Sequence, residues 1–313
     1  MSKLKVRKKR ISHRKILLYF TIFLVVISMI LYKLADRYLI EHVEVKNAIT
    51  NNTSTKSNQY AEDFTADNWS YASDSKKITI KKRTTSASGH KTTYFVADVQ
   101  LKDASILKSA FAKNQFGNNI IEFTSDIAKE NNAIFAINGD YYGFRDDGIT
   151  IRNSKVFRDQ PARTGLALYQ NGSMKTYEET DTSASELLSS GVTQTFSFGP
   201  ILVKNSKTTK DFGKLSIDKN FGNRSIEDSN PRTGIGIISP NHFVFIVVDG
   251  RSRNYSDGFT LDEFAKIFED LGCTDAYNLD GGGSSTMYFM GRVVNNPLGK
   301  HEERGVSDII YIN

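Results

Sequence analysis

The order of apolar and polar positions divides the chain into four regions. Residues 16–32, ILLYFTIFLVVISMILY, form an uncharged run of seventeen residues behind a basic segment. A polar stretch follows that is rich in Asn, Ser, Thr and Asp, which is typical of a spacer. From about Lys76, apolar residues recur with the spacing of strands and helices. The pattern predicts a basic cytoplasmic tail at 1–15, a transmembrane anchor at 16–33, a polar stalk at 34–75 and a folded domain at 76–313.

Two segments of the predicted domain have the spacing of amphipathic helices. Around 119–131, apolar residues recur at intervals of three and four. The second helix opens on a capping box, Thr260–Glu263, in which the Thr hydroxyl and the Glu carboxylate bind free backbone amides. An apolar stripe follows, and Gly272 suits the left-handed backbone at a helix end. We therefore expect helices around 119–131 and 261–271.

Several other segments have the pattern of strands, and three of them end in a polar corner that contains glycine. The run 243–248 is apolar throughout, which is typical of a strand buried on both faces. We expect the three corners to meet at one rim. Strands alternating with only two strong helices favour an α+β domain with mixed β-sheets and a few packed helices. The predicted strands are 77–81, 93–99, 133–137, 243–248 and 275–279, and the corners begin at Asn138, Asp249 and Asp280.

Charge is concentrated at the N-terminal end. Residues 1–33 contain nine Lys or Arg and no acid. The rest of the chain contains 32 basic and 35 acidic residues, so the formal charge of +6 comes from the N-terminal end. This balance gives no support to a nucleic-acid partner. A basic block before an apolar run predicts a cytoplasmic N-terminus, a bilayer contact through 16–33 and an extracellular domain. A cleaved signal peptide is the alternative, although residues 33–37, KLADR, make a poor cleavage site.

The segment 275–288, DAYNLDGGGSSTMY, places three consecutive glycines between two predicted strands. It lacks the lysine of a phosphate-binding P-loop, and no G-x-G-x-x-G is present in the chain. A hairpin is predicted next, turning at Met290-Gly291. Two interpretations stay open for the glycines. They form either a wide turn that uses positive φ angles or a loop whose backbone N–H groups hold an anion.

The acids and arginines near these corners suit the chemistry of a sugar phosphate. Glycosidic bonds are usually cleaved by two carboxylates, and three aspartates lie at predicted strand ends. A guanidinium group binds phosphate through a planar fork of donors. The candidate acids are Asp140, Asp249 and Asp280, and the candidate arginines are Arg232, Arg251 and Arg304.

The sequence requires no metal or other cofactor. Its five histidines have no zinc-ligand spacing. An acid-rich corner leaves a divalent cation, Ca²⁺ or Mg²⁺, open. The single cysteine, Cys273, follows a predicted helix, and we expect it to be a small buried residue rather than a nucleophile.

Seven motifs, in order along residues 133–313, resemble those of the phosphodiester glycosidase family. This family includes N-acetylglucosamine-1-phosphodiester α-N-acetylglucosaminidase and bacterial proteins of the exopolysaccharide-biosynthesis type. One motif alone would be a weak signal, whereas seven in order make a specific match. The motifs are Asn138-Gly139 with Tyr141-Tyr142, then 198–203, 231–236, 247–251, 258–261, 278–286 and 303–306.

The resemblance implies a hydrolase that cuts between the anomeric carbon of a sugar and a phosphodiester, releasing sugar and phosphomonoester. It implies Asp280 and Asp249 as catalytic acids, with their individual roles left open. Asp140 stands where the family often has a small residue, and we treat it as a candidate third carboxylate. The implied substrate-binding and phosphate-binding residues are Asn138, Gly139, Arg232, Thr233, Arg251, Asn278, Gly281, Gly282, Gly283, Ser284 and Arg304.

The expected substrate is a glycosyl phosphodiester, either a small molecule or part of a cell-surface sugar-phosphate glycopolymer such as an exopolysaccharide. Two other functions remain open from the sequence. A non-catalytic module would bind anionic polysaccharide during its assembly. A phosphodiesterase would cut the other P–O bond and release a phosphorylated sugar.

Overall fold

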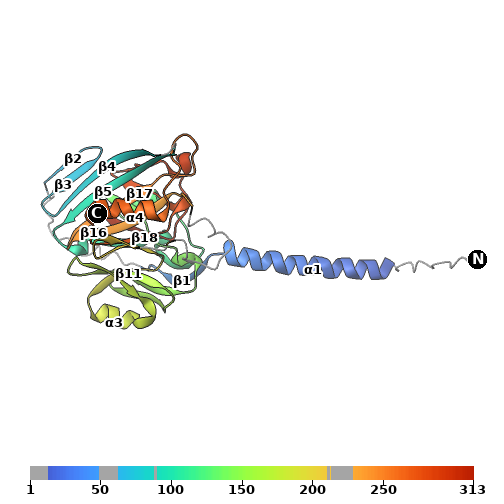
Figure 1. The fold of residues 1–313 in the computed structure, drawn as a ribbon. Helices are drawn as coiled ribbons and strands as arrows, with labels where there is room; N and C mark the ends of the chain where they lie inside the picture. Colours follow the sequence, from blue (N-terminus) through green and yellow to red (C-terminus); the bar gives the residue numbers. More distant parts are fainter. Residues whose placement is uncertain (1–12, 49–62, 88–89, 210–211, 213–227) are drawn as a thin grey trace, which may run out of the picture. The chain divides into compact units, whose positions relative to one another are not determined.

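The computed structural model describes residues 13–48, 63–87, 90–209, 212 and 228–313 (Figure 1). The chain divides into two compact units, 1–42 and 43–313. In the first unit, helix α1 (His13–Tyr38) has 26 residues and a mean hydropathy of 2.3 in its most apolar window. This helix is long and apolar enough to cross a bilayer. It continues past the predicted end at residue 33, and most of the predicted basic tail lies outside the described residues.

A nine-stranded sheet dominates the second unit, and every pairing in it is antiparallel. Its strands come from both ends of the unit, so segments far apart in sequence lie side by side (Figure 1). Their order across the sheet is β15 (Lys207–Thr208), β14 (Ile201–Lys204), β18 (Asp275–Leu279), β16 (Arg232–Ser239), β17 (His242–Val248), β5 (His90–Leu101), β4 (Lys76–Ala87), β3 (Ser70–Ser73) and β2 (Phe64–Ala66).

A five-stranded sheet is also antiparallel throughout. Its order is β20 (Arg292–Val293), β19 (Met287–Phe289), β8 (Phe135–Asn138), β21 (Asp308–Ile312) and β6 (Leu107–Phe111). Three smaller sheets complete the unit: β12 (Met174–Glu178), β11 (Thr164–Tyr169) and β13 (Val192–Phe196); β10 (Lys155–Gln160) and β9 (Gly148–Arg152); β1 (His42–Lys46) and β7 (Gln115–Asn118).

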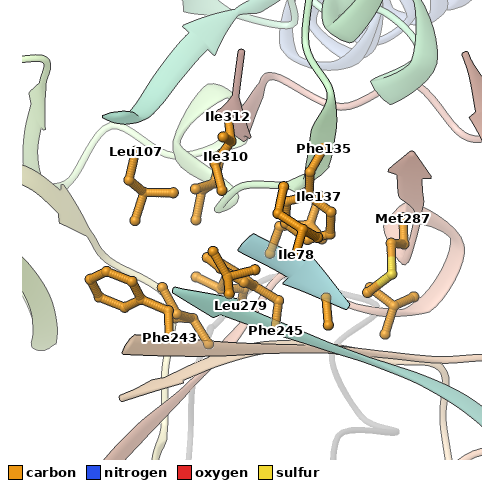
Figure 2. Close-up of a cluster of buried hydrophobic side chains, with 14 of the residues drawn as sticks. Ile78, Leu107, Phe135, Ile137, Phe243, Phe245, Leu279, Met287, Ile310 and Ile312 are labelled. Carbon is orange, nitrogen blue, oxygen red and sulfur yellow. The ribbon is translucent and has the colours of Figure 1, made fainter. Parts of the chain in front are cut away.

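The two-residue period of the strands builds a layered core. On β17, Phe243, Phe245 and Val247 belong to the cluster that also holds Phe135 and Ile137 of β8 (Figure 2). The alternate β17 residues, 244, 246 and 248, belong to a second cluster with helix α4 (Leu261–Asp270). Helix α2 (Thr124–Glu130) likewise packs on the other face of the five-stranded sheet. The two large sheets therefore pack face to face between these helices.

The α+β class is confirmed, and the two large sheets are more uniformly antiparallel than the mixed sheets we expected. The capping box of α4 is present on both sides, with Thr260 and Glu263 each bound to the other's backbone amide. Helix α3 (Ala184–Ser189) has the same device. Helix α2 is shorter than predicted and begins at Thr124, because Glu122 before it pairs in extended form with Val306.

The predicted stalk at 34–75 differs from the structure at its two ends. Helix α1 occupies its first residues, and β1 pairs with β7. Near its end, β2 and β3 extend the nine-stranded sheet beyond β4. Residues 49–62 lie outside the described residues. The folded unit thus includes strands before residue 76. The sequence did not predict them because edge strands carry polar side chains, and a polar segment has the composition of a spacer.

Candidate active site

The glycine-rich segment is a fixed loop at the end of β18. The backbone N–H of Gly282 donates to the carbonyl of Pro231 at 2.9 Å. A Cβ on Gly281 would lie 2.8 Å from that same carbonyl oxygen, and Gly282 has a φ of +61°. Residues Gly282–Ser284 form one short 3-10 turn. Glycine is required here for close approach to β16 as well as for the turn, and a flexible linker is excluded.

Asn138 at the end of β8 ties this loop to the five-stranded sheet. Its side chain is buried, and Nδ2 donates to the backbone carbonyl of Asp280 at 2.7 Å. Oδ1 accepts from the Thr233 hydroxyl at 2.8 Å and from the Thr286 amide at 3.2 Å. Asn138 and Thr233, which we predicted to bind substrate, therefore contact the protein itself and position Asp280.

The side chain of Asp280, which directly precedes the glycine loop, is largely buried, with 13% of its surface exposed. Burial raises its pKa above the ordinary value of aspartate, while the charge of Arg304 and a hydrogen bond from Ser284 oppose that rise. Arg304 Nη2 lies 3.6 Å from Asp280 Oδ2. A carboxyl group whose pKa is raised by burial and lowered by a neighbouring cation can act as an acid, a base or a nucleophile.

Two arginine side chains lie against the glycine loop, and a third arginine, Arg232, is near enough for the charge of Arg251 to affect its pKa. Arg304 lies across Gly283, with Nη2 donating to the Ser284 hydroxyl at 2.6 Å, and half of its side chain is exposed. The Arg251 guanidinium lies beside Gly282 and donates through Nε to Asn230 at 2.8 Å. Arg232 is buried and donates to the carbonyls of Phe259 and Asp228.

The charge of one arginine lowers the pKa of the next in two cases. Burial, followed by the charge of Arg251, lowers the pKa of Arg232 to about 10. Burial and the charge of Arg304 lower the pKa of Arg251. The pKa of Arg232 still lies well above neutral pH, so its guanidinium remains charged there. The exposed side chains of Arg251 and Arg304 beside the glycine loop make it a candidate anion-binding site.

Asp249, at the end of β17, uses its carboxylate to hold neighbouring loops. It accepts hydrogen bonds from the Tyr255 hydroxyl and Asn295 Nδ2, both at 2.8 Å, and from the Asn296 amide at 3.0 Å. Asn295 also donates to the carbonyl of Ser285 and accepts from Met287. Burial raises the pKa of Asp249. The observed contacts stabilise the glycine loop, and a catalytic role for Asp249 stays a prediction.

Asp140 belongs to a buried ion-pair cluster. Arg152 Nη2 lies 3.2 Å from Asp140 and 2.7 Å from Asp308, and all three side chains are buried. The oxygens of Asp140 also accept from the amides of Tyr142 and Ser197. Gly139 lies so close to Asp308 that a Cβ would be 2.1 Å from its Oδ1. These contacts are structural, and catalysis by Asp140 also stays a prediction.

The remaining predicted residue, Asn278, is buried on β18 and donates to the carbonyl of Gly199 at 2.8 Å. Sequence reasoning missed Arg145, Arg152 and Asn295, whose partners lie far along the chain and leave no local pattern.

Within the described residues, no group of three His, Cys, Asp or Glu side chains is arranged to hold a metal ion. Burial raises the pKa of Cys273 to about 12, as expected for a packed thiol.

Comparison with known proteins decides the family. A family model described as phosphodiester glycosidase matches residues 131–313, which is more than half of the chain. The chain belongs to the phosphodiester glycosidase family. This confirms the resemblance seen in the ordered motifs. The family is one of glycosyl phosphodiester hydrolases, and its motifs supply the corners around Asp280.

Relatives of this chain include the SPbeta prophage-derived uncharacterized protein YomE of Bacillus subtilis (strain 168). The two are 33% identical over 207 residues, covering 63% of this chain and 30% of YomE. The chain therefore matches less than a third of that relative's length.

Two solved structures share the fold. The zebrafish N-acetylglucosamine-1-phosphodiester alpha-N-acetylglucosaminidase catalytic domain, auto-inhibited by its pro-peptide, matches with a TM-score of 0.60 and 19% identity, covering 88% of this chain and 96% of that one. A hypothetical protein from Synechocystis matches with a TM-score of 0.52 and 13% identity, over 81% of this chain and 64% of that one. At these identities the likeness is one of fold.

Proposed function

We propose that this phosphodiester glycosidase is an extracytoplasmic hydrolase that cleaves sugar-1-phosphodiester bonds in a cell-surface glycan or glycopolymer. The observation that carries the proposal is that Asp280 lies 3.6 Å from Arg304 and directly precedes the glycine loop, against which both Arg304 and Arg251 lie. The loop and its arginines hold the phosphate, and Asp280 faces the sugar–oxygen bond. A phosphomonoester leaves as an anion, and the two arginines stabilise the charge that develops on it.

The proposed location follows from α1 and the basic residues before it. Lys and Arg on the N-terminal side of a spanning helix keep that side in the cytoplasm. The hydrolase unit then lies outside the cell, where sugar-phosphate polymers are accessible to it. The bilayer is its second partner, through α1.

Isotope labelling of the products tests the reaction. The full chain in a non-ionic detergent is incubated in H₂¹⁸O with the methyl phosphodiester of N-acetylglucosamine-1-phosphate and with wall polymers. Cleavage at the anomeric carbon places the label on the free sugar and none on the phosphomonoester. Label on the phosphate, with release of a sugar phosphate, would instead identify a phosphodiesterase. Saturable binding without any product would identify a polysaccharide-binding module.

Replacing Arg304 by Gln is expected to shift one limb of the pH profile of kcat/KM to higher pH. The charge of Arg304 lowers the pKa of Asp280, so its loss raises that pKa further. If Asp280 donates a proton, the alkaline limb moves; if it acts as base or nucleophile, the acidic limb moves. Lys300→Gln, in an exposed position of the same region, is the control and should move neither limb. A profile unchanged by Arg304→Gln would show that Asp280 is not the titrating group.

A further inference from the structure

The segment that carries Arg304 lies against the residues that lead into α2. The backbones of Glu122 and Val306 exchange two hydrogen bonds, with N···O distances of 3.1 and 2.8 Å. Gly305 packs against Ile121, and a Cβ on this glycine would lie 3.0 Å from the Cβ of Ile121. The chain on the C-terminal side of Arg304 is therefore held in place.

Glu303 holds the chain on the N-terminal side of Arg304. Its Oε1 accepts a hydrogen bond from the Ser125 backbone amide at 3.0 Å, and its Oε2 accepts one from the Ser125 hydroxyl at 2.5 Å. Ser125 is 8% exposed and lies in the first turn of α2, where backbone amides have no partner within the helix. A carboxylate that uses both oxygens on one residue is held in one orientation. Arg304 thus extends from a backbone that is attached on both sides.

Arg304 stands between these attached residues and contacts the glycine loop. Its Nη2 donates to the Ser284 hydroxyl at 2.6 Å, and its Cδ lies 3.2 Å from the position of a Cβ on Gly283. The same nitrogen lies 3.6 Å from Asp280 Oδ2. Half of the Arg304 side chain is exposed, and holding an exposed arginine in one rotamer costs free energy. A fixed backbone at its base limits the positions that the guanidinium can take, which lowers the cost of binding an anion.

We propose that Glu303 is a positioning residue for phosphate binding: by holding Ser125, it fixes the backbone from which Arg304 reaches the anion. This inference rests on the proposed function, in which Arg304 binds the substrate phosphate. The carboxylate of Glu303 would by its charge alone weaken the binding of a nearby anion. Positioning has the opposite sign, because it strengthens anion binding through Arg304. Substitutions can therefore separate the two effects.

Isothermal titration calorimetry of the full chain in detergent with inorganic phosphate tests the proposal without catalysis. Glu303→Ala is expected to weaken phosphate binding by about tenfold, because Arg304 becomes free to leave the loop. Glu303→Gln keeps an oxygen for the Ser125 amide without the charge, and it should stay within about threefold of the unchanged chain. Glu302→Ala, at the exposed neighbouring acid, is the matched control and should not weaken binding.

A double-mutant cycle identifies the residue through which Glu303 acts. In the Arg304→Gln chain, Glu303→Ala should weaken phosphate binding by less than about twofold, since the side chain that it positions is gone. Glu303→Ala should also move the pH profile of kcat/KM in the direction expected for Arg304→Gln. Equal losses in both backgrounds, unchanged or tighter phosphate binding in Glu303→Ala, or no phosphate binding by the unchanged chain would overturn the proposal.

Binding and hydrolysis together separate this inference from the proposed function. Phosphate binding that depends on Glu303, in a chain that hydrolyses no glycosyl phosphodiester, would refute the proposed function and keep the positioning role. Hydrolysis with unaltered phosphate binding in Glu303→Ala would do the reverse. Thermal unfolding of each variant verifies the fold. If Glu303→Ala does not fold, Ser125→Ala replaces it in the cycle; it removes only the hydroxyl bond and should weaken phosphate binding by about threefold.

Discussion

Asp280→Asn is expected to lower kcat by about 10³-fold while leaving KM and the unfolding temperature almost unchanged. Asn keeps the shape of the side chain and the backbone carbonyl that Asn138 binds, so the loop stays in place. It removes the proton or the charge that the reaction uses, and a single acid–base group is worth about 10²–10⁴-fold. The measurement is steady-state hydrolysis of a glycosyl phosphodiester, with thermal unfolding followed in parallel.

Asp275→Asn is the matched control for this variant. Asp275 lies at the other end of the same strand, where it pairs with Ile237 of β16. It should keep at least about half of the activity, since surface substitutions away from a site change little. A loss of less than about tenfold in Asp280→Asn would move the catalytic role to another carboxylate, and Asp249→Asn would then be the variant to measure.

Arg152→Met is expected to lower the free energy of unfolding at pH 7 by about 3–5 kcal/mol, the cost of breaking a buried ion pair by removing one partner. Arg152 has no exposed side-chain surface and pairs with Asp140 and Asp308. Met retains much of the apolar contact over Phe196, whose ring centroid lies 4.3 Å from the guanidinium carbon. The loss is therefore mainly electrostatic. Urea unfolding of the full chain in detergent, followed by circular dichroism, measures it.

The loss in Arg152→Met should be smaller at pH 4 than at pH 7. Burial raises the pKa of Asp308 to about 7 even beside Arg152, and removing the cation raises it further. A carboxyl group with a raised folded-state pKa stabilises the fold below its unfolded pKa and loses that contribution as pH rises. Lys129→Met, at an exposed pair with Asp126, is the control and should cost less than about 1 kcal/mol. Equal losses at both pH values would assign Arg152 a packing role only.

Local patterns in the sequence predicted the elements that build the rim of the site. The capping box located α4, the apolar run located β17, and Met290-Gly291 does form the turn between β19 and β20. The three predicted corners do converge. Asn138 contacts Asp280, and Asn295 binds both Asp249 and the carbonyl of Ser285 in the loop that follows Asp280. These predictions succeeded because each depends on residues adjacent in the chain.

The functions of individual side chains could not be predicted in the same way. Asn138 and Thr233 carry family motifs, yet their polar atoms bind the protein's own backbone and each other. Asp308, one of the two ion-pair partners of Arg152, lies 156 residues away. Only the packing of the two sheets decides which polar groups at a strand end face inward and which, like Arg304, remain exposed. Which polar side chains become buried therefore depends on contacts between residues far apart in sequence, and no local pattern in the sequence indicates them.

The bond between Asn138 and Asp280 joins β8 of one large sheet to the end of β18 in the other. Each sheet alone carries only part of the site, because the glycine loop takes its position from both. A chain in which only one sheet has formed has neither a placed carboxyl group nor a complete anion site. The position of Asp280 therefore depends on the packing of one sheet against the other, and a substitution that loosens this packing would displace Asp280 even from a distance.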